Sequence, residues 1–368
     1  MFILDRYIFS QWFKIFFGAM FVTLGILILH DAYSDLPDLI SYGANAATIT
    51  KYYALKLPSY IPVVLPISLL LSIIFSLGTL HRNSEIIAMR AAGLTIWRIS
   101  RPLWAAGICL SIMLFYLNAD IVPKAVQAGR ADIEALRLAG ERKAHKTSNN
   151  DIINHLSFNN RKNSRIWFVR EFVKSTNEAK GVEVHVLDNQ SRETHAVRAK
   201  YGFYNEKSRC WTFKDGFEVF FDAQTSNAIR TLKFKEKTFK DFGEDPDIME
   251  LTIKRPKDLS VLELRHLIDV LGEEKEMLPY SVQLQSMLTS PFVCLIVVAI
   301  AIPFSVAGVR TNPMVGVSKT VGLFFAYYLL TNIFTAVGSK DLLTPAMAAW
   351  IPNIIMMVWA LSLYRKVV

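Results

Sequence analysis

The segment Leu80–Arg101, LHRNSEIIAMRAAGLTIWRISR, decides the fold because it places a cluster of charges between two long apolar runs. The ionised residues in it are Arg82, Glu85, Arg90, Arg98 and Arg101. Apolar runs of about 20 residues are long enough to cross a bilayer. The segment therefore predicts a short polar connection between two membrane-spanning helices.

Six apolar runs in the chain approach or exceed this length. They are Trp12–His30, Ser59–Leu80, Leu103–Ile121, Ser286–Val309, Val315–Val337 and Pro345–Tyr364. The average composition shows a modest excess, with 52% hydrophobic residues among 368 and a mean hydropathy of +0.28, because the middle of the chain is polar. The first run has the alternative of a signal peptide, but no small-residue cleavage motif follows Leu29, and we expect a retained span.

Basic residues predict the orientation of these spans. Arg6 and Lys14 lie at the start of the first run, and the segment above carries four arginines. Arg310 and Lys319 flank the short turn between the fourth and fifth runs, and Arg365 and Lys366 follow the sixth. Lysine and arginine are enriched in cytoplasmic loops. Both termini are therefore expected in the cytoplasm and the long insert outside it.

The insert changes character along its length. Residues 123–150 have a helical pattern, and residues 151–258 alternate apolar and polar residues in short runs separated by turn signals, which is typical of an antiparallel sandwich or jelly roll. The stretch RCWTFKDGFEVFF reads as two strands joined by a DG turn, with the apolar side chains Trp211, Phe213, Phe217, Val219 and Phe221. These side chains form either a core or a groove for an acyl chain.

The segment LSVLELRHLIDVLGEEKE predicts a surface or interfacial helix that starts with Ser260 and Glu263 at capping-box spacing.

The remaining patterns argue against chemistry performed by the chain itself. The sequence contains no nucleotide-binding phosphate loop, zinc-protease motif or nucleophile elbow, and its three cysteines have no metal spacing. The net charge of +9 fits the orientation bias or an anionic ligand at the membrane. We expect a non-enzymatic protein that binds no nucleic acid and no cofactor.

Residues 83–93 predict a short amphipathic helix on the cytoplasmic membrane surface. Ser84 is expected to cap it, Glu85 lies in the first turn, and Gly93 suits its end. Tethering to lipid headgroups explains the arginines. It does not explain an acid near an anionic surface, whereas a protein partner with a basic residue for Glu85 does.

Three segments resemble the LptF/LptG family of lipopolysaccharide-export ABC transporter permeases, also called YjgP/YjgQ. They are LDRYI, LPISLLLSIIFSLGTLHRNSEIIAMRAAG and SPFVCLIVVAIAIPFS. NSEIIAMRAAG is the most specific block, and LDRYI leans toward the LptG branch. The likeness covers essentially the whole chain: three spans, an outer β-domain and three spans.

The resemblance implies the machinery and the partners. This chain is expected to pair with a second LptF/LptG-type permease above an LptB ATPase dimer that uses ATP. Its β-jelly-roll would pass lipopolysaccharide, taken from the outer leaflet of the inner membrane, to LptC and LptA. ATPase coupling is expected at Arg82, Ser84, Glu85, Arg90 and Gly93. Arg130 is carried over as a lipid-head residue, and Lys124, Arg137 and Lys340 are added from position alone.

Two departures from LptG-type members concern phosphate recognition. The place where they often carry lysines after the first span reads HDAYSDLPDL here, and Met287 stands four residues before Pro291 where they tend to have lysine. The lipid head is therefore either less anionic or contacted by charges of the partner permease.

The predicted organisation has four parts. Residues 1–122 hold three spans, 123–150 a helical extension, 151–258 the β-domain, and 259–368 the interfacial helix and three further spans. Two alternatives for the function stay open. One is an ABC permease with another cargo or a mechanical role, and the other is a membrane-anchored β-domain scaffold.

Overall fold

The computed structural model describes residues 3–367 except 42, 130–151, 161–162, 174–175, 189, 191, 206–207, 223–226, 272–274 and 308–312. The chain divides into two compact units. A membrane unit comprises Met1–Gly140, Ser260–Leu262 and Leu278–Val368, and a β unit comprises Glu141–Leu259 and Glu263–Met277. The predicted fold class, membrane helices with an all-β insert, is confirmed.

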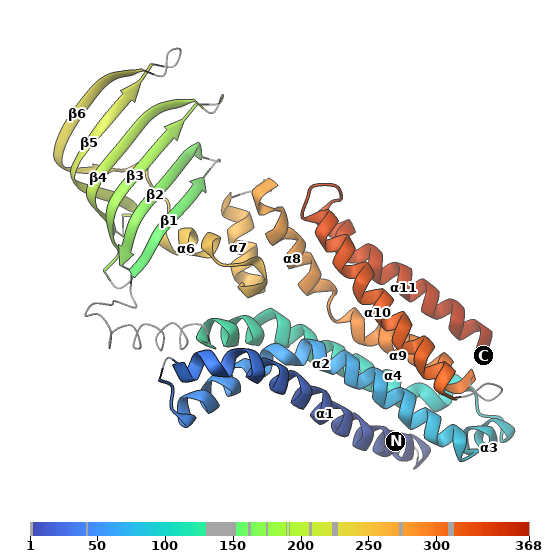
Figure 1. Ribbon diagram of the computed structural model, residues 1–368. Coiled ribbons are helices and arrows are strands. Elements are labelled where there is room, and N and C mark those ends of the chain that lie inside the picture. The colour runs from blue at the N-terminus through green and yellow to red at the C-terminus, as the bar shows by residue number, and fades with distance from the viewer. Residues whose placement is uncertain are drawn as a thin grey trace. The chain divides into compact units, whose positions relative to one another are not determined.

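The membrane unit is built from helices, most of them long and apolar (Figure 1). They are α1 (Ile3–Ser41), α2 (Ala46–Arg82), α3 (Glu85–Ala91), α4 (Ile96–Tyr116), α8 (Leu278–Thr289), α9 (Phe292–Ala307), α10 (Pro313–Gly338) and α11 (Pro345–Val367). Among the described residues, five helices are long and apolar enough to cross a membrane, and α8 with α9 supplies a sixth when this bent pair is taken as one span.

The fourth predicted span is not a single straight helix. The chain turns by 51° between α8 and α9, and Pro291 lies in the break, because proline lacks an N–H and disfavours a helical residue before it. The predicted apolar run Ser286–Val309 covers the end of α8 and all of α9, and α8 itself begins earlier, at Leu278.

A π-helical turn, Leu117–Ile121, follows α4 and ends two residues before Pro123. The helix continues beyond this proline to Gly129. The turn brings Asn118 to the α8–α9 break, where its Nδ2 donates to Ser290 Oγ at 3.1 Å. An irregular turn of α4 and an irregular junction of the fourth span thus stabilise each other.

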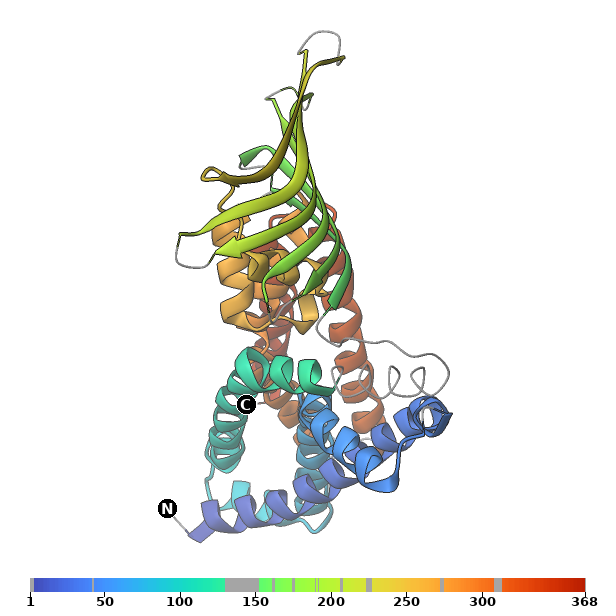
Figure 2. The ribbon, with the colours of Figure 1, turned by 90° about the vertical axis from the view of Figure 1, so that its left-hand side faces the viewer.

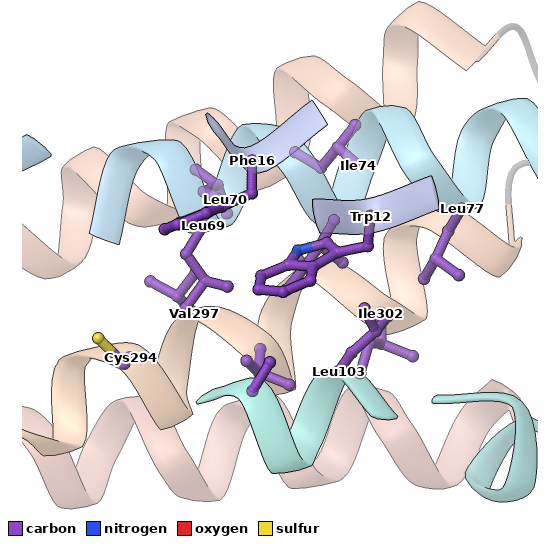
Figure 3. Close-up of a cluster of buried hydrophobic side chains, with 14 of the residues drawn as sticks. Trp12, Phe16, Leu69, Leu70, Ile74, Leu77, Leu103, Cys294, Val297 and Ile302 are labelled. Carbon is purple, nitrogen blue, oxygen red and sulfur yellow. The ribbon is translucent and has the colours of Figure 1, made fainter. Parts of the chain in front are cut away.

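The core of the membrane unit joins helices that are far apart in sequence (Figure 3). Trp12 and Phe16 of α1 lie over α2, while Leu103 of α4 and Val297 and Ile302 of α9 complete the cluster. The α4–α9 contact is close at Gly107, where an added Cβ would lie 2.7 Å from Val298. Figure 1 shows α10 and α11 packed alongside each other.

The β unit is one antiparallel sheet whose six described strands pair in sequential order. They are β1 (Ile152–Asn160), β2 (Arg165–Val173), β3 (Glu178–Leu187), β4 (Glu193–Asn205), β5 (Cys210–Phe221) and β6 (Ala228–Phe239), followed by α6 (Pro246–Ile253) and α7 (Val261–Leu271). Figure 2 shows the strong twist of the sheet. Trp167, Trp211, Phe213 and Phe242 pack as an aromatic core on one face.

A crease crosses all six strands. The residues without a Cα partner at this level are His155, Arg170, Gly181, Lys200, Asp215 and Lys235. On alternate strands these residues have positive φ, 56° at His155, 64° at Gly181 and 52° at Asp215. The alternation of buried and exposed side chains shifts by one there. In β2, for example, Val169 is buried and the next buried residue is Phe172.

The crease replaces the predicted DG turn. Asp215 and Gly216 lie inside the continuous strand β5, so the prediction of a hairpin there is wrong. A Cβ on Gly216 would lie 2.5 Å from the carbonyl oxygen of Arg198. Glycine is required because the neighbouring backbone approaches closely, not because the chain reverses.

Candidate functional site: the α3 helix and the N-terminal end of α1

The short helix α3 ends where the sequence predicts. Gly93 has φ +83°, a conformation that favours glycine. Its N–H donates to the Arg90 carbonyl at 2.9 Å, and the Leu94 N–H donates to the Met89 carbonyl at 3.1 Å. These two bonds form a Schellman motif, and the predicted role of Gly93 as helix stop is confirmed.

The start of α3 differs from the prediction. Ser84 has φ 62° and ψ 10° and makes no side-chain cap, so the predicted capping by its hydroxyl is wrong. A capping side chain needs an extended backbone. Only two residues, Asn83 and Ser84, separate α2 from α3, and the left-handed Ser84 makes the tight turn between the two helices.

Glu85 is held by two neutral donors of its own chain. Tyr7 of α1 donates its hydroxyl to Glu85 Oε2 at 2.9 Å. Asn83 donates its side-chain N–H to Glu85 Oε1 at 3.2 Å. Glu85 as a whole is half-buried, but both hydrogen bonds of its carboxylate are exposed, and the bond from Tyr7 lies on the side of α1. In the described part of the chain, no ion pair is recorded for Glu85.

The remaining side chains of α3 divide into a buried and an exposed face. Ile86 is 1% exposed and belongs to the membrane-unit core, and Met89 packs against that core. Ile87 and Arg90 are exposed. The predicted amphipathic character is therefore present, and Ile86 attaches the helix to the core.

A second polar contact joins the N-terminal end of α1 to α4. Asp5, which is 8% exposed, lies 3.7 Å from Arg98 (Oδ2 to Nη2). Asp5, Tyr7 and the fully buried Ile8 fall within one turn of α1. This turn contacts the α3 segment, the start of α4 and the hydrophobic core.

The whole-chain comparison identifies the class of protein to which this α3 site belongs. The family model described as "Lipopolysaccharide export system permease LptF/LptG" matches residues 6–366. The chain belongs to the LptF/LptG permease family. A curated relative, the lipopolysaccharide export system permease protein LptG of Haemophilus influenzae, is 23% identical over 98% of this chain and 99% of its own length. The chain is thus similar to a permease from end to end, and it is a multi-pass membrane protein.

A second polar cluster of this LptF/LptG-family permease lies at the other end of the α1–α2 pair. Lys56 Nζ lies 2.5 Å from Asp31 and 2.7 Å from Asp35. Tyr52 donates to Asp35 at 3.0 Å and Tyr60 donates to Asp31. The acidic stretch HDAYSDLPDL therefore serves to hold α1 against α2 through Lys56.

The residues expected to contact a lipid head are widely separated in the chain. Lys124 is exposed and pairs with Asp120 at 2.6 Å, and Lys340 is exposed after the end of α10. Arg130 and Arg137 lie outside the described residues. Within the described residues no group of three or more His, Cys, Asp or Glu side chains suits a metal ion.

The five residues of the predicted groove do not share one face. Trp211 and Phe213 are fully buried in the aromatic core. Phe217 is 38% exposed, and Val219 and Phe221 are half-buried. The crease at Asp215 separates the first pair from the other three, because it shifts the alternation of the strand.

The core-side face of β5 beyond the crease carries buried polar groups. Glu218 is 3% exposed and accepts a hydrogen bond from Lys237 Nζ at 2.7 Å. His195 stacks on Phe220 with ring centroids 4.7 Å apart. Burial lowers the pKa of His195 below its ordinary value, and Lys237 acts in the same direction against the opposing charge of Glu218. The imidazole is therefore neutral near pH 7.

Sequence reasoning missed Tyr7 and Lys56. Tyr7 lies in LDRYI, which served only as a resemblance motif, and its contact with Glu85 joins residues 78 positions apart. Lys56 had a local signal, since Tyr52, Lys56 and Tyr60 repeat every four residues and so fall on one face of a helix.

Proposed function

We propose that this chain is one of two LptF/LptG-type permeases that extract lipopolysaccharide from the outer leaflet of the inner membrane. ATP is hydrolysed by a separate LptB dimer, and this chain binds no cofactor of its own. The β unit lies in the periplasm and passes the lipid to LptC and LptA, while both termini lie in the cytoplasm. Family membership and the distribution of basic residues support this arrangement.

The observation that carries the proposal is the geometry of Glu85. It is the single acid of α3, a helix that is attached to the core by Ile86 and ended by Gly93. A basic residue of the ATPase that reaches this carboxylate would form a charge-assisted hydrogen bond. Arg82, Ser84 and Arg90 flank it as further contacts for the ATPase surface, and all three are exposed.

Lipid extraction requires both an energy source and an apolar path. Exposing one acyl chain to water costs about 0.8 kcal/mol per CH₂, on the order of 10 kcal/mol per chain. We propose that ATP supplies this energy and that the β unit shields the chain. The more exposed side chains Phe217, Val219 and Phe221 are the contacts on β5, while Trp211 and Phe213 form the packed base of the sheet.

The lipid phosphates are assigned to basic residues at the outer rim of the membrane unit. Lys124, Arg130, Arg137 and Lys340 are the proposed contacts. Lys124 remains well suited although it is paired with Asp120, because its side chain is 70% exposed and surface ion pairs are weak.

Replacing Glu85→Gln tests the function. The amide keeps the size of the side chain and removes its charge, and the loss of a charge-assisted bond costs about 1.5–3 kcal/mol. We expect the amount of ATPase retained during purification to fall about tenfold or more. ATP-driven release of lipopolysaccharide to LptA should fall with it. Both are measured on the reconstituted complex.

The matched control is Glu236→Gln. Glu236 is an exposed acid of the β unit, 60% exposed and 3.6 Å from Lys214, so its replacement should leave ATPase retention unchanged. Normal ATPase retention and normal lipid release in the Glu85→Gln complex would contradict the coupling role.

A further inference from the structure

We propose that Tyr7 is a positioning residue for Glu85 and that it holds the Glu85 carboxylate in place for the ATPase. The same hydrogen bond transmits the movement of α3 directly to α1. This inference rests on the proposed coupling function of Glu85. It adds a mechanical connection between α3 and the first membrane helix that does not pass through α2.

The first step is the hydrogen-bond capacity of Glu85. A carboxylate offers about four lone-pair sites on two oxygens. Tyr7 occupies one site on Oε2 at 2.9 Å, and Asn83 occupies one on Oε1 at 3.2 Å. One site remains on each oxygen, so a cationic group of a partner binds without displacing Tyr7. Tyr7 therefore orients the carboxylate and does not compete with the partner.

The second step concerns the elements that carry the two donors. Asn83 directly follows α2 and lies two residues from Glu85, so its bond is local. Tyr7 belongs to α1 and is 78 residues from Glu85 in the sequence. Of these two bonds, only the one from Tyr7 connects α3 to another membrane helix.

The third step is the packing beneath the Tyr7 bond. Ile8 of α1 is fully buried, Ile86 of α3 is 1% exposed, and both belong to the same hydrophobic cluster. The neighbouring Asp5 lies 3.7 Å from Arg98 at the start of α4. A displacement of α3 by a docked ATPase therefore acts on the first turns of α1 through the Tyr7 bond and through the hydrophobic cluster to which both helices contribute.

The test is Tyr7→Phe in the complete transport complex, which removes only a hydroxyl from a side chain that is 46% exposed. Tyr33→Phe is the control, because Tyr33 is 88% exposed on the same helix. The readout is the ratio of lipopolysaccharide released to ATP hydrolysed. We expect this ratio to fall about threefold in Tyr7→Phe, the effect of one ordinary hydrogen bond, and to stay unchanged in Tyr33→Phe.

Two further variants separate positioning from transmission. Asn83→Ala removes the donor that does not belong to α1, and it should weaken ATPase retention while the ratio of lipid to ATP stays normal. When Tyr7→Phe is introduced into the Glu85→Gln protein, it should lower the ratio of lipid to ATP less than it does in the unmodified protein. The reason is that the two residues act as one unit.

The outcomes distinguish this inference from the function on which it rests. If Glu85→Gln disturbs the complex but Tyr7→Phe behaves like Tyr33→Phe, the role of Tyr7 is overturned and the coupling function stands. Equal ratios in Tyr7→Phe and Asn83→Ala, or full additivity of Tyr7→Phe with Glu85→Gln, overturn the transmission to α1. A Glu85→Gln complex that behaves like the unmodified one overturns the coupling function itself.

Discussion

The two ends of the α1–α2 pair are held by polar contacts of different strength. At the end near the α1–α2 turn, one ammonium lies between two carboxylates, Asp31 and Asp35, within 2.5 and 2.7 Å, and two tyrosines complete the network. At the N-terminal end, Asp5 and Arg98 lie 3.7 Å apart, and among the described residues one side-chain hydrogen bond, from the neutral hydroxyl of Tyr7, joins α1 to α3.

This difference indicates at which end of α1 the polar contacts break more easily. A multiply hydrogen-bonded ion network in a partly buried place resists separation, whereas one long ion pair and one half-exposed hydrogen bond separate at little cost. The aromatic contacts of Trp12 and Phe16 lie between the two ends. We therefore expect the polar contacts at the N-terminal end of α1 to break more easily than the Lys56 network, while Ile8 anchors that end in the apolar core.

The largest predicted effect comes from removing the cation of the stronger end. Lys56→Met leaves Asp31 and Asp35 facing each other, with side chains 25% and 35% exposed. The loss of the ion pairs and the repulsion that remains cost about 2 kcal/mol, less than a fully buried pair. The apparent melting temperature of the detergent-solubilised protein should fall by several degrees.

Lys51→Met is the matched control for this prediction. Lys51 is exposed on the same helix, and because contacts of an exposed lysine contribute little to stability, its replacement should leave the melting temperature nearly unchanged. Adding Asp31→Asn and Asp35→Asn to Lys56→Met should restore part of the loss. Equal melting temperatures for Lys56→Met and Lys51→Met would show that the two ends of α1 are held with similar strength.

The features of the membrane unit were not equally predictable from the sequence. Apolar length fixed the membrane helices, and Gly93 fixed the end of α3, because both depend on local physics. The backbone at Ser84 could not be predicted, since two residues between α2 and α3 decide its left-handed conformation. The Tyr7–Glu85 bond could not be predicted either, because it depends on how α1 packs beside α3.

The β unit shows the same limit. Alternation predicted the strands, and the aromatic pair Trp211 and Phe213 is part of the core. The prediction for β5 was wrong at the crease. A DG pair occurs both in hairpin turns and in creased strands, so the two residues alone do not distinguish the two structures. The close approach of Arg198 from β4 to Gly216 is a tertiary fact without a local signal.

A smaller effect is expected from destabilising the end of α3. This change would weaken the attachment of α3 at the N-terminal end of α1 and so increase the difference between the two ends of α1. Gly93→Ala places a Cβ on a residue with φ +83° and costs about 1 kcal/mol. The end of α3 should fray, and retention of the ATPase should fall about fivefold. Gly78→Ala is the control, because Gly78 is inside α2 with no atom within 4 Å of an added Cβ. Retention that is equal in the two variants would mean that the Schellman motif does not matter for docking.

The smallest effect is expected from Asp5→Asn at the N-terminal end. The ion pair with Arg98 is long, and Asp5 Oδ1 is buried without a hydrogen-bond partner in the described part of the chain. Removing the charge therefore gives up a weak attraction and also relieves the cost of burying a carboxylate. The two terms offset each other, and the change in the free energy of unfolding should stay within about 0.5 kcal/mol.

The same melting measurement checks Asp5→Asn against Lys56→Met. A loss at Asp5 as large as the loss at Lys56 would place the rigid attachment of α1 at its N-terminal end. α3 would then push against a fixed helix, and the stroke would have to travel through α2. A melting temperature within a degree or two of the unmodified protein is the result required if the N-terminal end of α1 moves with α3, because a helix end can follow a small displacement only where its own contacts cost little to break.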